Sequence, residues 1–256
     1  MNMRFERTTL MLGDSGMKSL NESFVVVAGL GAVGGYAVEA LARAGVGRMR
    51  LVDFDVVCPT NINRQIYALE STIGRKKTEL AAERVRQINP ECKVELLDSF
   101  IHTDTMDAVL SGQPDIVIDA IDSLTPKVEL IIALKERAIP SVSSMGAALR
   151  DDPSLIRSGL LKKVNYCPLA AAIRKRLRRR GVSLDVRCVY SIQQPIRQAL
   201  AEPQSTDENI MRGHLRGRPR KTLGSLPTIT AIFGMTIAND VIKMLIDMKI
   251  KEDKGK

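Results

Sequence analysis

FVVVAGLGAVGGYAVEALARAGVGRMRLVDFD, residues 24–55, is the stretch that decides the fold of this chain. Its first five residues are apolar and mostly valine, which is typical of a buried parallel strand. A G-x-G-x-x-G pattern follows, formed by Gly29, Gly31 and Gly34. Where a strand turns into a helix, the first glycine permits a tight turn, the second lets the backbone approach a phosphate, and the third lets the helix pack against the strand. A second apolar run ends in Asp53, where such a unit holds a ribose hydroxyl, so the stretch predicts a nucleotide site.

The alternation of strand and helix patterns continues beyond this unit. Apolar runs predict further strands at 93–97, 115–119 and 141–144, and the segments around them predict helices at 74–88, 104–110 and 126–138. Later in the chain we expect strands at 155–161 and 186–191, a basic helix at 169–180 and a terminal helix at 228–248. The pattern predicts an α/β fold, a Rossmann-like, doubly wound, mostly parallel sheet with a smaller C-terminal extension and a long terminal helix.

A chain of 256 residues is long enough to bury one sizeable core. We expect a single domain made of a helical lead-in at 1–21, a nucleotide-binding core at 22–150, and a half at 151–256 that faces the substrate and a second copy. Because hydrophobic residues make up 45% of the chain and aromatic residues 4%, the core should be aliphatic. The terminal helix carries an apolar stripe that is typical of a core or a dimer interface, formed by Ile232, Thr236, Val241, Met244 and Leu245.

Cysteine spacing and the ends of the chain indicate where the protein works. The four cysteines, Cys58, Cys92, Cys167 and Cys188, include no C-x-x-C pair, which argues against structural zinc and against a secreted disulfide framework. The first residues lack the order of regions of a signal peptide. The longest uncharged run near the end, 226–239, is too short to span a bilayer. We therefore expect a cytoplasmic protein without zinc and without a membrane span.

Polar residues follow the ends of the expected strands. Asn61, Arg64 and Gln65 lie in the loop after the second strand, and open α/β sheets bind ligands at the carboxyl ends of their strands. Residues 75–77, Arg-Lys-Lys, open the next helix, where cations oppose the helix dipole unless they bind a phosphate or point into water. The strand at 115–119 ends in Asp119, and Asp122 follows three residues later. These two acids can either cap the following helix or hold Mg²⁺ beside a phosphate.

Positive charge is a property of the whole chain, whose net charge of +9 favours anionic partners. Six of the seven residues from 174 to 180 are cations, namely Arg174, Lys175, Arg176, Arg178, Arg179 and Arg180. Clustered Lys and Arg are typical of binding to a phosphate backbone, and a solvated helix face is the alternative. A second basic cluster falls in 198–222, which we expect to be a long mobile loop. The charges indicate nucleic acid as a partner.

Taken together and in order, these blocks resemble the ThiF/MoeB/HesA superfamily of ubiquitin-activating-like adenylating enzymes. The resemblance rests on the glycine pattern, Asp53-x-Asp55, Asn61-x-x-Arg64-Gln65, Lys77 and Asp119-x-x-Asp122. The blocks DVVCPTNINRQIYAL, RQINPEC, VIDAIDSLTPK and GSLPTITAIFG are most similar to a branch of that superfamily that modifies tRNA. The resemblance runs over most of the chain.

The resemblance implies an ATP site and assigns roles to its residues. The residues that would contact the nucleotide are Gly29, Gly31, Gly34, Asp53, Asp55, Asn61 and Gln65. Arg64 and Lys77 would contact the phosphates, and Asp122 would hold Mg²⁺. Arg7 sits where related enzymes send an arginine across a dimer interface to the partner's ATP, so a homodimer is implied as well.

The implied reaction is the ATP-dependent dehydration of threonylcarbamoyladenosine in tRNA. The carboxylate is first adenylated, because a carboxylate is a poor electrophile until it carries a leaving group such as AMP, and the chain then closes into a ring with loss of water. Arg64, Lys77, Arg7 and Mg²⁺ would offset the charge at the α-phosphorus. No cysteine nucleophile is needed, although Cys167, Cys188 and a sulfur-transfer partner protein stay open by analogy with sulfur-handling relatives.

Three other functions share part of the pattern. The first is adenylation of the C-terminal glycine of a small ubiquitin-like sulfur carrier, but relatives with that activity often carry two C-x-x-C zinc pairs, which this chain lacks. The second is an NAD-dependent oxidoreductase, which does not explain Arg64, Lys77 and Asp122 at one edge of the sheet. The third is a non-catalytic tRNA-binding protein, which explains the charge and leaves the nucleotide site without a purpose.

Overall fold

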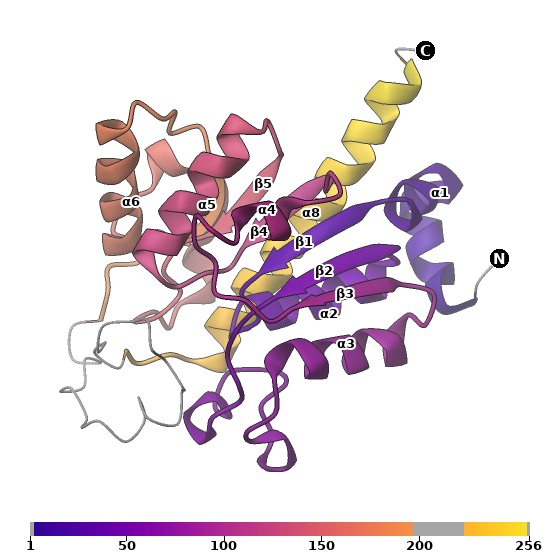
Figure 1. Cartoon of the computed structure of the whole chain (residues 1–256), viewed down its shortest axis with the longest axis horizontal. Helices are drawn as coiled ribbons and strands as arrows, with labels where there is room; N and C mark the ends of the chain where they lie inside the picture. The colour runs from indigo at the N-terminus through magenta and orange to yellow at the C-terminus, as the bar shows by residue number, and fades with distance from the viewer. Residues whose placement is uncertain (1–2, 197–222, 255–256) are drawn as a thin grey trace.

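The strands form a seven-stranded sheet in the order β3-β2-β1-β4-β5-β7-β6 (Figure 1). In the computed structural model, which describes residues 3–196 and 223–254, the strands are β1 (Phe24–Ala28), β2 (Arg48–Val52), β3 (Lys93–Leu97), β4 (Ile116–Asp119), β5 (Ser141–Ser144), β6 (Ile156–Leu160) and β7 (Arg187–Ser191). Neighbouring strands are parallel except β6 and β7, which are antiparallel. From β1 the chain builds outward to β3 and then returns to β4 on the other side, so the topological switch point lies between β1 and β4. The predicted fold class is confirmed.

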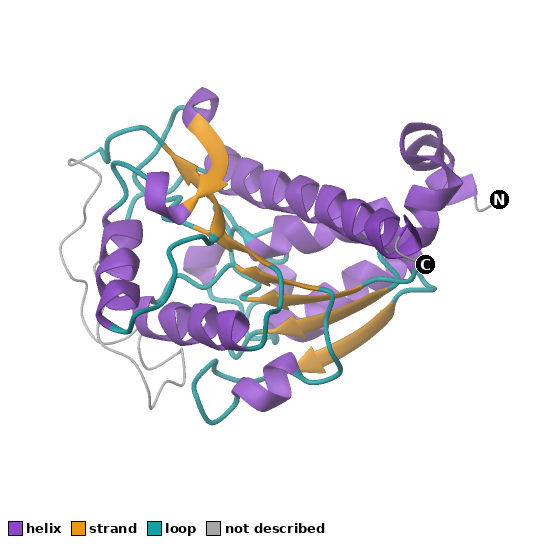
Figure 2. Ribbon diagram, turned by 90° about the horizontal axis from the view of Figure 1, so that it is seen from above, coloured by secondary structure: helices purple, strands orange, loops and turns teal. Residues whose placement is uncertain are grey.

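Helices cover both faces of this sheet (Figure 2). They are α1 (Glu6–Asn21), α2 (Gly34–Ala44), α3 (Lys77–Ile88), α4 (Met106–Leu110), α5 (Leu124–Glu136), α6 (Pro168–Arg179) and α8 (Pro227–Lys254). Side chains of β1 alternate between the two faces, as the period of a strand requires. Val25 and Val27 pack with α2, α3 and α8, whereas Val26 and Ala28 pack with α4 and α5. The strand is buried on both faces, which is why it consists of consecutive apolar residues.

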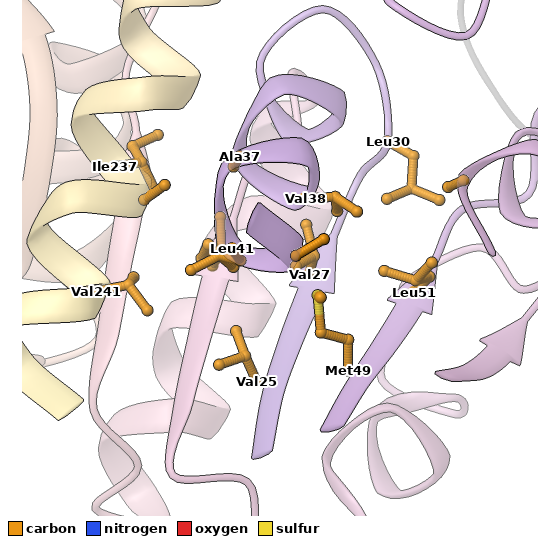
Figure 3. Close-up of a cluster of buried hydrophobic side chains, with 14 of the residues drawn as sticks. Val25, Val27, Leu30, Ala37, Val38, Leu41, Met49, Leu51, Ile237 and Val241 are labelled. Carbon is orange, nitrogen blue, oxygen red and sulfur yellow. The ribbon is translucent and has the colours of Figure 1, made fainter. Parts of the chain in front are cut away.

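The core beside β1 and β2 holds the first helix of the nucleotide-binding unit in place. Figure 3 shows Val27, Leu41 and Ile237 converging from β1, α2 and α8, and each is fully buried. Burying one such side chain stabilises the fold by about 1.5–3 kcal/mol. The glycine turn therefore sits on a rigid element, because α2 is packed between the sheet, α3 and α8.

The terminal helix α8 approaches α2 closely. A Cβ atom on Gly234 would lie 2.4 Å from the carbonyl oxygen of Val33, so this contact requires glycine. The buried face of α8 consists of Ile229, Phe233, Ile237, Ala238, Val241 and Leu245. Of the predicted stripe, Val241 and Leu245 lie in this core and Met244 packs against it, whereas Ile232 is exposed and Thr236 is half-buried.

One helix in the part of the chain that the structure describes is long and apolar enough to cross a membrane. It covers residues 227–249 with a mean hydropathy of 1.6, and half of its apolar window is buried inside the protein. The uncharged run 226–239 is only part of this helix, which also contains charged residues and is long enough to span a bilayer. Its burial against α2 is the property of a core helix.

The lead-in helix α1 lies at the amino ends of the strands, away from the glycine turn (Figure 1). Gly13 breaks it with φ +71° and ψ 171°, whereas Gly16 is buried inside its second part and causes no break. Phe5 contacts the end of α2, since a Cβ atom on Gly45 would lie 3.6 Å from Phe5 Cδ1. Residues 198–222, predicted as a mobile basic loop that contains Arg212, Arg216, Arg218, Arg220 and Lys221, lie outside the described residues.

Candidate active site

The glycine turn is tight at its ends and open in its middle. Gly29 has φ +93°, and a Cβ atom there would lie 2.9 Å from the carbonyl oxygen of Ala120, just after β4. A Cβ atom on Gly34 would lie 1.8 Å from the carbonyl oxygen of Gly29. Around Gly31, in contrast, the nearest atom to an added Cβ is Gln65 Nε2 at 3.8 Å. This open backbone at the start of α2 fits a phosphate, because a helix N-terminus offers free N–H groups.

Asp53 braces this turn from the end of β2. Its Oδ2 accepts a hydrogen bond from Leu30 N at 2.6 Å, and its Oδ1 accepts one from Asp55 N at 2.8 Å. Burial raises the pKa of Asp53, and the charge of Lys77 and the two N–H donors oppose that rise only in part. Two acceptor sites of the carboxylate are thus engaged in holding the loops together. The predicted contact with a ribose hydroxyl would use its remaining lone pairs.

Lys77 is a buried cation at the first position of α3. Its Nζ lies 2.9 Å from Asp55 Oδ2, and the residue is 4% exposed. Burial disfavours the charge, but the carboxylates of Asp53 and Asp55 outweigh it and raise the pKa of Lys77. The side chain is therefore a cation at neutral pH. A charge held in a dry environment acts more strongly on a neighbouring phosphate than one in water.

The three cations at the start of α3 each pair with a carboxylate of this chain. Arg75 pairs with Glu83, and Lys76 Nζ lies 2.7 Å from Asp98 Oδ2. Arg75 and Lys76 are exposed and paired on the surface, which agrees with the alternative that these cations point into water. Lys77 differs from both because it is buried beside Asp53.

Asn61 and Gln65 come from the loop after β2, whose 3-10 turn η2 spans Pro59–Asn61. Asn61 is 5% exposed, and its Oδ1 accepts a hydrogen bond from Cys58 N at 3.2 Å. That oxygen shapes the loop. Gln65 lies over Gly31, so of these two side chains it is the one next to the open part of the glycine turn.

Arg64 occupies the rim of the same loop. Its Nη1 donates to Thr60 O at 2.8 Å and to Asn63 Oδ1 at 2.7 Å. Asn63 Nδ2 in turn donates to Ser225 O at 3.2 Å, just before α8. The half-buried guanidinium is thus held in place, and contact with a phosphate would exchange some of these bonds.

The structure separates the two acids that follow β4. Asp119 is fully buried, with its Oδ2 2.7 Å from Lys127 Nζ and 2.6 Å from Ser143 Oγ. The expectation that Asp119 faces a ligand or caps α5 is wrong, because both partners lie inside the protein. Asp122 is exposed, and Ala120, two residues earlier, lies against Gly29. Of the two acids, Asp122 is the one at the protein surface.

Arg7 lies far from the glycine turn of its own chain. It is exposed on α1, at the amino edge of the sheet. One chain therefore does not bring Arg7 together with Lys77 and Asp122. A contact with nucleotide, as the family resemblance implies, would have to come from a second copy.

The basic run on α6 is divided into two sets. Three cations bind groups of their own chain: Arg174 the carbonyl of Val164 (2.7 Å), Arg176 the hydroxyl of Thr125 (2.8 Å) and Arg180 the carboxylate of Glu129 (2.8 Å). Lys175, Arg178 and Arg179 are exposed and make no hydrogen bond or ion pair with a described residue. Their spacing of three and four residues puts them on one helix face, which we name the α6 cation face. Of the six cations that are predicted to bind nucleic acid, these three are the ones that are not engaged with other described residues.

Cysteines and metal ligands do not gather near the site. Within residues 3–196 and 223–254, no three His, Cys, Asp or Glu side chains are grouped so that they hold a metal ion. Burial raises the pKa of the Cys188 thiol to about 12, which disfavours the nucleophilic thiolate. Cys167 is buried at the start of α6, where its Sγ accepts a hydrogen bond from Ala170 N. A role of either cysteine in sulfur chemistry stays a prediction.

Three buried polar residues near β4 and β5 are not predicted by the sequence patterns. Lys127 and Ser143 enclose Asp119, and Arg150 lies 3% exposed after β5. Lys and Arg are rarely buried, so their type alone argues for the surface. The one available signal was that Lys127 falls in a helix between apolar residues that are themselves buried.

Known proteins share the sequence pattern and the fold of this chain. The ThiF family model matches residues 5–255 of the chain. The tRNA threonylcarbamoyladenosine dehydratase of Bacillus subtilis (strain 168) is 37% identical over 256 residues, covering 99% of both chains. That of Escherichia coli (strain K12) is 38% identical over 256 residues, covering 95% of this chain and 93% of the relative. The crystal structure of E. coli tRNA N6-threonylcarbamoyladenosine dehydratase, TcdA, in complex with ATP matches with a TM-score of 0.85 and 34% identity, covering 97% of this chain and 96% of the other. The chain therefore belongs to the ThiF family.

Proposed function

We propose that this protein catalyses the ATP-dependent dehydration, by cyclisation, of threonylcarbamoyladenosine in tRNA. The observation that carries the proposal is the likeness to a dehydratase solved with ATP, which extends over 97% of this chain and includes the half beyond residue 150. The open backbone at Gly31 and the buried cation Lys77 give that likeness a chemical basis. A nucleotide-binding fold by itself would not distinguish one substrate from another.

The reaction activates a carboxylate and then closes a ring. A carboxylate oxygen of the threonylcarbamoyl group attacks the α-phosphorus of ATP, forming a P–O bond and breaking the bond to pyrophosphate. An internal nucleophile of the same group then attacks the activated carbonyl carbon, and AMP leaves with the former carboxylate oxygen. The tRNA loses one water in total, and the enzyme supplies no nucleophile of its own. Its task is to position the reactants and offset charge.

The described residues divide this task. Backbone N–H groups at the start of α2 bind phosphate oxygens, and Lys77 offsets the charge that develops at the α-phosphorus. Arg64 closes over the phosphates from the rim, exchanging its contacts with Thr60 and Asn63. Gln65 lies over Gly31, beside the phosphate path. Losing one preorganised contact of this kind costs on the order of 10²-fold or more in rate.

Asp122 is the residue that we propose to hold Mg²⁺, with phosphate oxygens of ATP completing the ligand set. A lone carboxylate fits this role because Mg²⁺ beside phosphates needs only one or two protein carboxylates. The ion would neutralise phosphate charge. Replacing Asp122→Asn should raise the Mg²⁺ concentration needed for half-maximal AMP formation, whereas Asp107→Asn, on the exposed side of α4, should not. An unchanged Mg²⁺ requirement would remove Asp122 from the metal site.

A homodimer would bring Arg7 to the nucleotide of the other copy. Large apolar side chains are exposed near it on α1, where Leu10 is 80% and Met11 83% exposed, as in surfaces that bind a partner. The test mixes two inactive variants, Arg7→Ala and Lys77→Met. If Arg7 acts on the other copy, mixed dimers contain one complete site and recover about a quarter of the wild-type activity. If activity does not return, Arg7 does not act across a dimer.

The partner tRNA is an anion and a cytoplasmic molecule, and we propose the same location for this protein. The α6 cation face would contact the tRNA backbone, since Arg176 of the same helix touches Thr125, three residues from Asp122. A sulfur-transfer partner stays a prediction to which no surface of the described residues is assigned.

The decisive experiment combines purified protein, ATP, Mg²⁺ and threonylcarbamoyl-modified tRNA. Mass spectrometry of the digested tRNA should find the modified nucleoside lighter by one water, with one AMP released for each product. The second candidate within the family is adenylation of a small sulfur-carrier protein, which the same ATP site would support. An unchanged nucleoside mass, together with pyrophosphate exchange that requires a carrier protein, would favour this second candidate.

A further inference from the structure

Arg150 is a buried cation whose charge is not matched by a carboxylate within residues 3–196 and 223–254. The residue is 3% exposed, and its Nε and Nη1 atoms are buried without a hydrogen-bond partner. Its Nη2 donates to Tyr166 O at 2.6 Å. No carboxylate of the described ranges pairs with it, and burial lowers the pKa of Arg150 accordingly.

Other buried cations of this protein are compensated. Lys77 pairs with Asp55, Lys127 pairs with Asp119, and Arg50 pairs with Glu95. Buried polar groups in folded proteins nearly always have partners, because leaving a charge unpaired in a dry interior is costly. Arg150 departs from this rule. A bound ligand that supplies the missing hydrogen-bond acceptors would explain why such a guanidinium is buried.

Two of the four non-glycine residues with positive φ in the described ranges lie at the same place. Leu149, directly before Arg150, has φ +61°, and Tyr166, which accepts the hydrogen bond from Arg150, has φ +55°. Residues with a side chain rarely adopt this left-handed conformation, and such residues cluster at sites that bind ligands. The strain thus holds the guanidinium and its one partner in a fixed arrangement.

The guanidinium lies at the carboxyl edge of the sheet, beside the amino end of α6. Arg150 follows β5, which lies two strands from β1, a lateral separation of about 10 Å at the usual strand spacing. Tyr166 precedes the N-cap residue Cys167 and the 12-residue helix α6. A helix N-terminus carries partial positive charge. A cation and the positive end of a helix therefore meet, and both are stabilised by an anion.

We propose that Arg150 and the amino end of α6 form an oxyanion subsite that binds an anionic group of the modified tRNA. This inference rests on the proposed function. Two groups of that substrate share the required chemistry: the carboxylate of the threonylcarbamoyl group and a backbone phosphate next to the modified nucleotide. Arginine binds both with charge-assisted hydrogen bonds.

The test compares two replacements of Arg150 with a matched control. Arg150→Met removes the charge, and Arg150→Gln keeps a donor for Tyr166 O. Arg157→Met on β6 removes the same charge from an exposed arginine whose partners are backbone carbonyls. Affinity for tRNA and the melting temperature are measured for all four proteins. Both Arg150 variants should bind modified tRNA about tenfold or more weakly, because a hydrogen bond to a charged group is lost, and the control should not.

The melting temperature separates this role from a structural one. Removing an unpaired buried charge should leave the melting temperature of the Arg150 variants unchanged or raised, whereas loss of ordinary packing would lower it. If Arg150→Met does not fold, Arg150→Gln decides. A folded Arg150→Gln protein with wild-type affinity for modified tRNA overturns the proposal.

Modified and unmodified tRNA distinguish the two sources of the anion. If the carboxylate is bound, the Arg150 variants lose affinity for modified tRNA alone. If a phosphate is bound, they lose affinity for both tRNAs to the same extent. Failure of the wild-type protein to convert modified tRNA would reject the proposed function, and the substrate named here with it. Conversion by the wild type with unaltered affinity in both variants would reject this inference alone.

Discussion

Lys127 Nζ lies 2.7 Å from Asp119 Oδ2, and both side chains are completely buried. Lys127 also donates to Asp119 O and to Ser143 Oγ, each at 3.2 Å. Asp119 Oδ1 accepts a hydrogen bond from Ile121 N at 3.2 Å. The pair therefore ties α5 to β4 and β5 and fixes the backbone that leads to Asp122. The position of Asp122, the candidate metal ligand, therefore depends on an ion pair that lies inside the protein and does not itself contact the nucleotide or the metal ion.

Replacing Lys127→Met should lower the free energy of unfolding by about 3–5 kcal/mol, because it leaves the carboxylate of Asp119 buried and unpaired. The double variant Lys127→Met with Asp119→Leu should recover most of that loss, since neither charge remains. Urea unfolding measures both. Lys135→Met, on the exposed side of the same helix, should change stability by less than about 0.5 kcal/mol. A Lys127→Met protein as stable as the wild type would contradict this assignment.

Neighbouring lysines at the start of α3 provide a matched pair for testing catalysis. Lys77→Met removes a cation that is 4% exposed beside the glycine turn, and it should slow AMP formation on the order of 10²-fold or more. Lys76→Met removes a cation that is paired with Asp98 on the surface, and the rate should stay within a few-fold of the wild type. Single-turnover kinetics with saturating tRNA measure the effect on the chemical step. Equal losses in both variants would mean that general charge, and not the position of Lys77, matters.

Stability in acid should depend on Glu39. Burial opposes its charge, but Arg84 and Arg43 outweigh burial and lower its pKa below the ordinary value of 4.5. The unfolded chain therefore binds the proton more readily, so the stability from Glu39 is present above about pH 4.5 and is lost as pH falls through the lowered pKa. Between about pH 5 and pH 3, the unfolding free energy of Glu39→Gln should fall less steeply than that of the wild type.

The control for this pH dependence is Glu79→Gln, the same change at an exposed site on α3. Other carboxylates with lowered pKa, such as Glu95 and Asp98, are present in all three proteins, so their contribution cancels in the comparison. Urea unfolding at a series of pH values supplies the data. Curves for Glu39→Gln and wild type that run parallel through this range would show that the two arginines do not favour the charged carboxylate.

The parts of the fold that the sequence predicts are those set by local pattern. The strands at 24–28, 93–97 and 141–144 begin and end where they were expected, because each is a short apolar or alternating run between turn residues. Gly29 and Gly34 were predictable for the same reason, since no other residue fits their contacts. Those features require only neighbours in the chain.

The features that escaped prediction are pairings between distant residues. Lys77 and Asp55 are 22 positions apart, and their contact pairs the buried cation with a half-buried carboxylate. The side of α8 that faces the core is set by the close contact between Gly234 and Val33. The spacing of apolar residues along the helix does not reveal that contact. Arg150 likewise donates to the carbonyl of Tyr166, which lies 16 positions later, beyond strand β6. Tertiary contacts decide which charged residue becomes buried, and composition alone favours the surface.

The division of the basic run on α6 yields the last prediction. Replacing Lys175, Arg178 and Arg179 together by alanine removes the α6 cation face and leaves the internal contacts of Arg174, Arg176 and Arg180 in place. If each lost cation neutralises one phosphate, the slope of log affinity against log salt should decrease in magnitude by about 2–3. Affinity measured at several salt concentrations gives that slope.

A second triple variant tests whether the position of the removed cations matters or only their number. Replacing Lys18, Arg86 and Lys93 by alanine also removes three exposed cations, from α1, α3 and β3. Long-range attraction alone would make both triple variants equally weak, because it depends on total charge and is screened beyond about 10 Å at 0.1 M salt. Direct contact predicts that the slope changes only when the α6 cation face is removed. Equal slopes in the two triple variants would show that the face is solvated and makes no contact with tRNA, whatever the affinity of either variant.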